Sequence, residues 1–220
     1  MILATLLKKE SQRKGLLRLQ FQFSTAVPFQ PGQFFSFLLN EDEALWRAYS
    51  VSASKGDKFT FEVALMNGGK GSAMLERMQV GRVLQVMGPY GNFTFEQPHP
   101  DGKVYFICTN TGVSPFVSMT LSLPSPSSLD ISLIYGMKKS DFLLYPEVWK
   151  NAGVKVYPFV SHEHFPSPPF QKGTVMDMVK GIAFTPQDSV YICGNPNMVY
   201  DVSQWISNRF QAKVKIERYL

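Results

Sequence analysis

Residues 193–198 read Cys-Gly-Asn-Pro-Asn-Met and carry the most informative chemical pattern in the chain. They follow an apolar run at 189–192 and open a helical pattern that begins near Met198. A thiol, a glycine and a helix N-terminus therefore meet where a buried strand ends. Because open α/β sheets bind ligands at the carboxyl ends of their strands, this run predicts a nucleotide site with Cys193 and Gly194 at its edge.

A second polar run lies far upstream, at residues 47–50, which read Arg-Ala-Tyr-Ser. Strand alternation places Arg47 and Tyr49 on one face and Ser50 on the other. A buried arginine requires an anion, so this strand is a candidate binding element. The structural alternative is an edge strand on which Arg47 forms an ion pair and Tyr49 packs in the core.

Residues 68–72 read Gly-Gly-Lys-Gly-Ser and precede the one helix expected in this half. Flexible backbone, a hydroxyl and a helix N-terminus together form a phosphate cradle. Ser72 is also placed to cap the helix. A plain hairpin loop explains the glycines nearly as well, so the run alone does not decide between the two interpretations.

Composition sets limits on the class of protein. The chain has 220 residues, of which 45% are apolar and 14% aromatic, enough for a packed core and too many for disorder. No apolar run approaches the roughly 20 residues of a membrane span, and residues 1–7 lack the features of a secretion signal. We therefore expect a soluble, cytoplasmic protein, and a monomer.

Cysteine content and charge exclude further classes. Two cysteines are too few for a disulfide scaffold or for an iron–sulfur cluster held by this chain alone. A net charge of +5 favours an anionic nucleotide or an acidic partner, although ordinary solubility charge explains it equally well. Basic residues do not cluster with aromatic ones, so no nucleic-acid partner is expected. The run His162-Glu163-His164 has no further His or Cys nearby, so we expect no metal site.

Turn residues divide the first hundred residues into short strands, which is typical of an antiparallel barrel or sandwich. The expected strands are 16–23, 33–39, 47–53, 59–65, 83–87 and 93–95, with a helix at 72–78. After the proline-rich segment 97–102, apolar runs alternate with helical patterns. Five strands are expected at 104–108, 130–135, 154–160, 190–193 and 214–217, a short element at 177–179, and helices at 115–123, 140–151 and 198–210. This alternation predicts a parallel sheet, and hence domains at 1–98 and 101–220.

The two polar runs of the first half, taken in order, resemble the flavin-binding domain of the ferredoxin–NADP reductase superfamily. The family has an Arg-x-Tyr-Ser strand, a Gly-x-x-Ser helix start and a Gly-Pro-x-Gly turn, which is similar to residues 88–91. The resemblance implies an N-terminal antiparallel β-barrel that binds FAD. The implied ligands are Arg47, Gly71 and Ser72 for the pyrophosphate, Tyr49 stacked on the isoalloxazine, Ser50 near flavin N5, and the backbone of Val63, Ala64 and Leu65 beside the flavin.

The second half extends the resemblance and implies a C-terminal α/β domain that binds NAD(P) on a five-stranded parallel sheet. Residues 108–115 are similar to the family loop that ends Thr-Gly-x-x-Pro. The matching residues there are Thr111, Gly112 and Pro115, while Thr109 and Asn110 stand where glycines are common. Residues 135–138 read Tyr-Gly-Met-Lys, with Lys138 in place of the usual arginine, and Asp141 and Tyr145 follow. Lysine keeps the charge and loses the planar fork that grips phosphate in two places.

The C-terminal part contains the most specific match, Cys-Gly-x-Pro-x-Met-Val at 193–199. By resemblance, Cys193 lies near the hydride-bearing nicotinamide carbon, and Gly194 and Met198 shape the pocket. Family members commonly end in Glu-x-Tyr. This ending implies that Tyr219 covers the flavin and yields to the nicotinamide, and that Glu217 is a proton-relay partner of Ser50.

The implied activity is an FAD-dependent NAD(P)H oxidoreductase that passes electrons to a ferredoxin or flavodoxin. A flavin reductase, an oxygenase reductase component and an electron-transfer subunit without its own turnover share most of these motifs. The coenzyme is left open between NADH and NADPH. Ser161 stands at the expected position for a 2′-phosphate ligand, and Lys172 and a protonated His162 favour NADPH. Glu163 suits a ribose diol and gives a slight preference for NADH.

Overall fold

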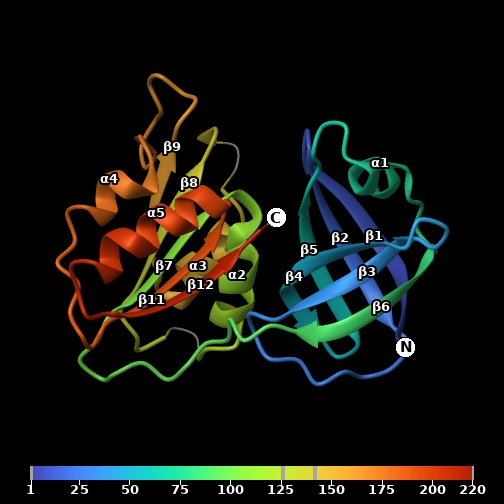
Figure 1. The fold of residues 1–220 in the computed structure, drawn as a ribbon, viewed down its shortest axis with the longest axis horizontal. Coiled ribbons are helices and arrows are strands. Elements are labelled where there is room, and N and C mark those ends of the chain that lie inside the picture. The colour runs from blue at the N-terminus through green and yellow to red at the C-terminus, as the bar shows by residue number, and fades with distance from the viewer. Residues whose placement is uncertain (1, 125–126, 141–142, 220) are drawn as a thin grey trace. The chain divides into compact units, whose positions relative to one another are not determined.

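The computed structural model describes residues 2–124, 127–140 and 143–219, so Asp141 lies outside the described residues. The chain divides into two compact units between Thr94 and Phe95 (Figure 1). The boundary predicted from the sequence, at residues 98–101, lies a few residues further on. Each unit has its own sheet and its own apolar core.

The first domain is a closed six-stranded barrel, drawn from blue to green in Figure 1. Every neighbouring pair of strands is antiparallel, as predicted. In barrel order the strands are β1 (Ile2–Arg13), β2 (Leu16–Phe23), β5 (Lys58–Ala64), β4 (Leu45–Lys55), β3 (Phe34–Asn40) and β6 (Val83–Tyr90). The helix α1 (Lys70–Arg77) connects β5 to β6 and buries Leu75.

Two differences from the expected strands have local causes. The strand β1 is not among the predicted strands, because only Ala4 and Leu6 of its twelve residues are buried and it lacks a sustained alternating pattern. The expected strand at 93–95 does not form. Phe93 is nevertheless buried, so an aromatic residue that packs without sheet pairing produced the strand-like pattern.

Phenylalanine fills the barrel. Six phenylalanines from three strands, β2, β3 and β5, are at most 2% exposed and form one cluster: Phe21, Phe23, Phe35, Phe37, Phe59 and Phe61. The ring of Phe37 lies 4.9 Å from that of Phe21 and 5.0 Å from that of Phe61, in tilted and edge-to-face arrangements that aromatic pairs favour. Phe37 also contacts Tyr49, at 5.9 Å between ring centres, so the core supports a candidate flavin residue.

The second domain has a parallel sheet of six strands. The five predicted strands are present, and the sixth, β10, is a two-residue edge strand too short to produce a sequence pattern. In sheet order the strands are β10 (Gln171–Lys172), β9 (Lys155–Val160), β8 (Ile131–Met137), β7 (Val104–Thr109), β11 (Ser189–Gly194) and β12 (Lys213–Arg218). All neighbouring pairs are parallel, which confirms the predicted fold class.

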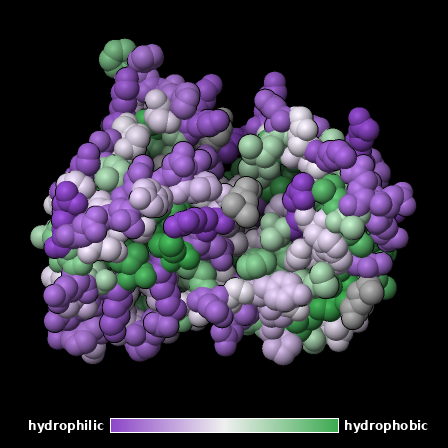
Figure 2. Space-filling view, in the orientation of Figure 1, coloured by the Kyte–Doolittle hydropathy of each residue, from purple (hydrophilic) through white to green (hydrophobic). Residues whose placement is uncertain are grey.

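Helices cover both faces of this sheet. The helices α4 (Val175–Val179) and α5 (Pro196–Ser207) share one apolar cluster with β7, β8, β9 and β11. The helices α2 (Ser114–Leu121) and α3 (Pro146–Ala152) lie on the other face, where Phe116 stacks on Phe106 with ring centres 4.5 Å apart. The outer surface of α4 and α5 faces the viewer in Figures 1 and 2 and is mostly hydrophilic, as expected for helices that bury one side.

The helices α3 and α5 differ from the predicted helices in their first residues. The helix α5 begins at Pro196, two residues before Met198, because the side chain of Asn195 caps it. The helix α3 begins at Pro146 rather than near residue 140, since proline suits a first turn and disfavours a helical residue before it. No helix in the described part of the chain has the length and apolar character needed to cross a membrane.

The barrel core allows a direct test of its contribution to stability. We expect Phe37→Ala to lower the free energy of unfolding by about 3–5 kcal/mol, because the residue is 1% exposed and contacts three other core phenylalanines. Phe165→Ala is the matched control, since Phe165 is 96% exposed and its loss is expected to change stability by less than about 0.5 kcal/mol. Urea denaturation measures both changes, and hydrogen exchange shows whether loosening is confined to the barrel. Equal stability of the two variants contradicts the prediction.

Candidate functional site

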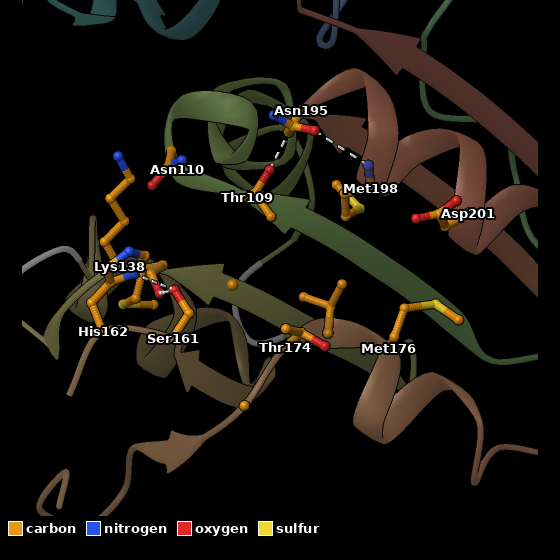
Figure 3. A pocket seen from close by; sticks show the side chains of 14 residues that line it. Thr109, Asn110, Lys138, Ser161, His162, Thr174, Met176, Asn195, Met198 and Asp201 are labelled. Atoms are coloured by element: carbon orange, nitrogen blue, oxygen red, sulfur yellow. Dashed lines mark hydrogen bonds between the residues drawn. The ribbon is translucent and has the colours of Figure 1, made fainter. Parts of the chain in front are cut away.

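A pocket of about 370 Å³ opens within the second domain, at the carboxyl edge of its sheet (Figure 3). This is the edge at which the sequence predicts a nucleotide site. The lining residues come from strand ends, from the loops that follow them and from α4 and α5: Thr109, Asn110, Gly136, Met137, Lys138, Ser161, His162, Gly173, Thr174, Val175, Met176, Asn195, Met198 and Asp201.

Backbone segments at this edge approach so closely that Gly112 has no room for a side chain. A Cβ atom at Gly112 would lie 2.5 Å from the carbonyl oxygen of Cys193 and 2.7 Å from the Cα atom of Gly194. The 3₁₀ turn η1 (Asn110–Val113) therefore packs directly on the backbone of β11. Two segments that the sequence assigned to one site are thus in contact.

A similar contact joins Gly194 to Thr109, at the ends of β11 and β7. Gly194 has a φ of +131°, and a Cβ atom there would lie 2.5 Å from Oγ1 of Thr109. The same Oγ1 atom accepts a hydrogen bond of 3.0 Å from the backbone N–H of Asn195. Thr109, which stands where the family often has glycine, therefore ties the two strand ends together at this edge.

Cys193 is completely buried next to two predicted C-terminal residues. Glu217 is its register partner on β12, and the backbone N–H of Tyr219 donates a 2.9 Å hydrogen bond to the carbonyl of Gly194. Burial raises the pKa of the Cys193 thiol well above its usual value; the Glu217 carboxylate raises it further, and a hydrogen bond with Tyr219 partly opposes the rise. The thiol is therefore neutral near pH 7. It offers a compact, polarisable surface and is not an activated nucleophile.

The start of α5 places Met198 in the pocket. Oδ1 of Asn195 accepts hydrogen bonds from the backbone N–H groups of Asn197 (3.0 Å) and Met198 (3.3 Å). This cap satisfies two amides that would otherwise lack partners in the first turn, and it fixes the helix against the end of β11. The predicted pocket role of Met198 thus has a structural basis.

The ends of β8 and β9 supply the basic corner of the pocket. Lys138, Ser161 and His162 line it together. The backbone N–H of His162 donates a 2.9 Å hydrogen bond to the carbonyl of Lys138, and the Ser161 hydroxyl lies 2.8 Å from Nδ1 of His162. The Lys138 ammonium, the Ser161 hydroxyl and the His162 ring here form a suitable site for a phosphate group.

Two other residues weighed for coenzyme choice lie outside the pocket lining. Oε1 of Glu163 accepts hydrogen bonds from the backbone N–H (2.7 Å) and the hydroxyl (3.0 Å) of Ser140. Nζ of Lys172 lies 3.2 Å from Nδ1 of His164. The geometry therefore gives no support to Glu163 as a ribose ligand or to Lys172 as a phosphate ligand. No group of three or more His, Cys, Asp or Glu among the described residues is placed to hold a metal ion.

In the barrel domain, Arg47 and Gly71 lie against each other. A Cβ atom at Gly71 would lie 3.3 Å from Cγ of Arg47 and 3.2 Å from Cδ1 of Leu39, so glycine lets the arginine stem lie against the first turn of α1. Arg47 is exposed, and its NH1 donates a 2.7 Å hydrogen bond to the carbonyl of Trp46. The premise of a buried arginine was therefore wrong. An exposed arginine at the first turn of a helix nevertheless suits an anionic pyrophosphate.

Tyr49 and Ser50 follow on the same strand with different environments. Tyr49 is half-buried, and burial raises the pKa of its hydroxyl to about 12, with a small opposing effect from Arg47. Its ring therefore stays uncharged and suits stacking on a flat ligand. Ser50 is 6% exposed, and its backbone pairs with Phe34.

The remaining barrel candidates lie around α1 and β5. Ser72 does not cap α1, which was the expected role. The cap position is Gly69, and Oγ of Ser72 accepts a 2.8 Å hydrogen bond from the backbone N–H of Met66, because the helix begins two residues before Ser72. Val63 is buried in the barrel, Ala64 is exposed, and Leu65 packs against the core cluster.

The predicted coenzyme residues fall into two groups. Lys138, Ser161 and Met198 line the pocket. Thr111, Gly112 and Pro115 are buried behind it, and Gly194 supports it through the contact with Thr109. Sequence reasoning did not assign Thr174, Met176, Asn195 or Asp201 to the site. One available signal was the Thr-x-x-Asp box at 174–177, in which Asp177 accepts a 2.7 Å hydrogen bond from the N–H of Thr174 and so marks another helix start at this edge.

Comparison with known proteins assigns both domains to families. Residues 4–95 match the oxidoreductase FAD-binding domain family, and residues 106–204 match the oxidoreductase NAD-binding domain family. Ferredoxin–NADP reductase B of Sorangium cellulosum is 27% identical over 212 residues, which cover 88% of this chain and 86% of that protein. The reductase component of phenol 2-monooxygenase from Pseudomonas sp. strain CF600 is 28% identical, and the match covers 82% of this chain and 54% of that protein.

Solved structures agree on the fold. A ferredoxin NADP⁺ reductase from Neisseria gonorrhoeae, solved with bound FAD and NADP, has a TM-score of 0.79 at 22% identity and covers 98% of this chain and 97% of its own. The two matched domain families, their order and the shared architecture lead to one assignment. The chain belongs to the ferredoxin–NADP reductase superfamily and is an FAD-dependent NAD(P)H oxidoreductase that transfers electrons.

Proposed function

We propose that this protein oxidises NADPH and delivers the electrons singly to a separate ferredoxin- or flavodoxin-type protein. The observation that carries the proposal is the coenzyme pocket at the sheet edge, with a basic corner of Lys138, Ser161 and His162. FAD, when bound, accepts a hydride and releases its two electrons one at a time. The protein residues bind and orient the reactants.

The barrel residues are assigned to FAD. Arg47 and the backbone at Gly71 bind the pyrophosphate, and Ser72 helps to hold the loop that precedes α1. The uncharged ring of Tyr49 stacks on the isoalloxazine, and Ser50 hydrogen-bonds near the reacting nitrogen. The backbone of Val63, Ala64 and Leu65 flanks the ring system. Contact between Arg47 and Gly71 supports this assignment, because a cation and the first turn of a helix then lie together and both attract an anion.

Residues of the sheet edge are assigned to the hydride donor. The neutral thiol of Cys193 packs against the nicotinamide, and Gly194 and Met198 limit where its ring can lie. Tyr219 covers the flavin at the nicotinamide position until the coenzyme binds. Glu217 is the proton-relay partner of Ser50. The support is the closeness of Cys193, Glu217 and Tyr219, which the pKa effects on the thiol reflect.

NADPH is favoured over NADH because of the cation Lys138 at one corner of the pocket, which lies on the opposite side from the lining carboxylate Asp201 (Figure 3). Lys138 and His162 line the pocket, whereas the carboxylate of Glu163 is engaged by Ser140. A 2′-phosphate at this corner gains charge-assisted hydrogen bonds that a ribose diol does not. This preference replaces the slight preference for NADH drawn from the sequence.

The 220 residues contain two cysteines, both buried, and an iron–sulfur cluster needs about four thiolates, so a cluster in the proposed acceptor has its ligands outside these residues. The relatives include ferredoxin–NADP reductases that this chain covers almost fully, and oxygenase reductase components of which it spans about half. A net charge of +5 suits an acidic acceptor.

An anaerobic titration of the purified protein tests the proposed function. We expect a flavin spectrum that NADPH bleaches at lower concentration than NADH. Reduced protein should then reduce an added ferredoxin or flavodoxin faster than it reduces free FMN. A protein that binds no flavin overturns the whole assignment, and preferred reduction of free FMN favours a flavin reductase.

Arg47→Ala is expected to weaken FAD binding by about 10- to 100-fold, the effect of losing a hydrogen bond to a charged group. Fluorescence of released FAD during dilution measures the dissociation constant. Arg77→Ala is the matched control, because Arg77 is an exposed arginine at the other end of the same helix. Equal FAD retention in both variants removes Arg47 from the pyrophosphate site.

Cys193→Ala is expected to retain FAD and to slow its reduction by NADPH about 10-fold or more, because the nicotinamide loses a surface that positions it. Since the pKa of the thiol is raised, the group stays protonated below about pH 8.5, the ordinary cysteine value. The wild-type reduction rate should therefore show no cysteine titration up to that pH. Stopped-flow absorbance measures both properties, and an unchanged rate in the variant excludes Cys193 from positioning.

Lys138→Ala is expected to raise the KM for NADPH about 10-fold and the KM for NADH less than about twofold, since one cation at the phosphate corner is lost. Lys172→Ala is the control, because Lys172 is paired with His164 and lies outside the pocket lining. Steady-state kinetics of each variant with NADPH and with NADH measure the two KM values. Equal effects on NADPH and NADH contradict a phosphate role for Lys138.

A further inference from the structure

Asn110 has a backbone conformation that usually belongs to glycine. Its φ is +49°, in the left-handed region, where asparagine is among the few side chains tolerated. The hydroxyl of Tyr135, a completely buried residue, donates a 2.9 Å hydrogen bond to the carbonyl of Asn110. The turn after β7 therefore keeps the geometry of a glycine loop and carries a carboxamide in addition.

The side-chain oxygen of Asn110 makes no hydrogen bond in the described part of the chain. Asn110 lines the same pocket as Lys138 (Figure 3). Its Oδ1 atom is buried. Buried polar atoms nearly always have partners, and leaving one without is costly. An unpaired carboxamide in a ligand pocket therefore indicates that the missing partner is a ligand group.

We propose that Asn110 is a coenzyme-binding residue whose carboxamide holds the pyrophosphate of the nicotinamide dinucleotide and the ribose hydroxyl beside it. The proposal rests on the proposed function, in which this pocket binds NADPH. It adds a side-chain ligand where the family resemblance predicts only glycine backbone.

The chemistry of a carboxamide selects this part of the coenzyme. The Oδ1 atom accepts one proton donor, and the Nδ2 group donates two hydrogen bonds. A ribose hydroxyl supplies the donor, and a phosphate oxygen next to it supplies the acceptor, so a ribose–phosphate unit satisfies both halves at once. If the amide is flipped, so that the oxygen and nitrogen exchange places, the oxygen still accepts from the ribose hydroxyl and the nitrogen still donates to the phosphate oxygen after a small shift of the ligand. The assignment of Asn110 to the ribose–phosphate unit is the same.

The location agrees with this selection. Asn110 begins the turn η1 between the end of β7 and α2, and strand-to-helix turns of this kind bind dinucleotide phosphates. The carbonyl of Asn110 is already bonded to Tyr135, which leaves the carboxamide as the group free to meet a ligand.

Calorimetric titration of the FAD-loaded protein with NADP⁺ and with adenosine 2′-monophosphate tests the proposal. Asn110→Gly retains the backbone geometry and removes the carboxamide. Asn110→Asp retains the shape, removes both donors and adds a negative charge. We expect NADP⁺ to bind Asn110→Gly about 10-fold more weakly than wild type and Asn110→Asp about 100-fold more weakly. Adenosine 2′-monophosphate lacks the pyrophosphate, so we expect its dissociation constant to change less than twofold.

The outcomes separate this proposal from the proposed function. Wild-type protein that binds neither ligand overturns both. Wild-type protein that binds NADP⁺ with the same affinity as Asn110→Gly overturns only the role of Asn110. If the variants bind NADP⁺ and adenosine 2′-monophosphate more weakly by the same factor, the pocket is distorted, and the proposed role of Asn110 is also overturned. Unchanged circular dichroism of Asn110→Gly, which relieves rather than creates backbone strain, verifies that the comparison uses folded protein.

Discussion

Direct backbone contact at the carboxyl edge of the parallel sheet is the constraint on which the site depends. Gly112 touches the end of β11, and Gly194 touches Thr109 at the end of β7, at distances that admit no Cβ atom. Protein interiors are close-packed, so a side chain at either position forces the strand ends apart. The position of Cys193, the cap of α5 and the shape of the pocket all follow from this contact.

The two domains solve the problem of holding a flat, charged cofactor in different ways. The barrel surrounds a cluster of phenylalanines, and its binding candidates lie on the outer parts of β4 and α1, supported by the Phe37–Tyr49 contact. The α/β domain has its candidates at strand ends, with rigid support from helices on both faces. In each domain glycine allows a close approach, at Gly71 beside Arg47 in the barrel and at Gly112 and Gly194 in the α/β domain.

Much of this architecture is readable from the sequence, because strand alternation, buried apolar runs and turn residues are local patterns. All strands of both sheets except β1 and β10, and the edge carrying Cys193, were predictable for that reason. Strand β1 and the cap of α1 were not, since β1 buries only two residues and Ser72 bonds to Met66 across a loop. Whether a charged residue faces the pocket also depends on long-range contacts, as the pairing of Glu163 with Ser140 shows.

The segment between β9 and β10 carries residues that we propose for coenzyme choice, apart from those that we propose for hydride transfer. His162 and Ser161 lie on it, and Lys138 lies at the end of β8, outside the glycine contacts that position Cys193. Loops accept substitutions and insertions far more readily than packed strand ends. Substitutions in this segment therefore leave unchanged the steric requirements at Gly112 and Gly194, which fix the end of β11 that carries Cys193.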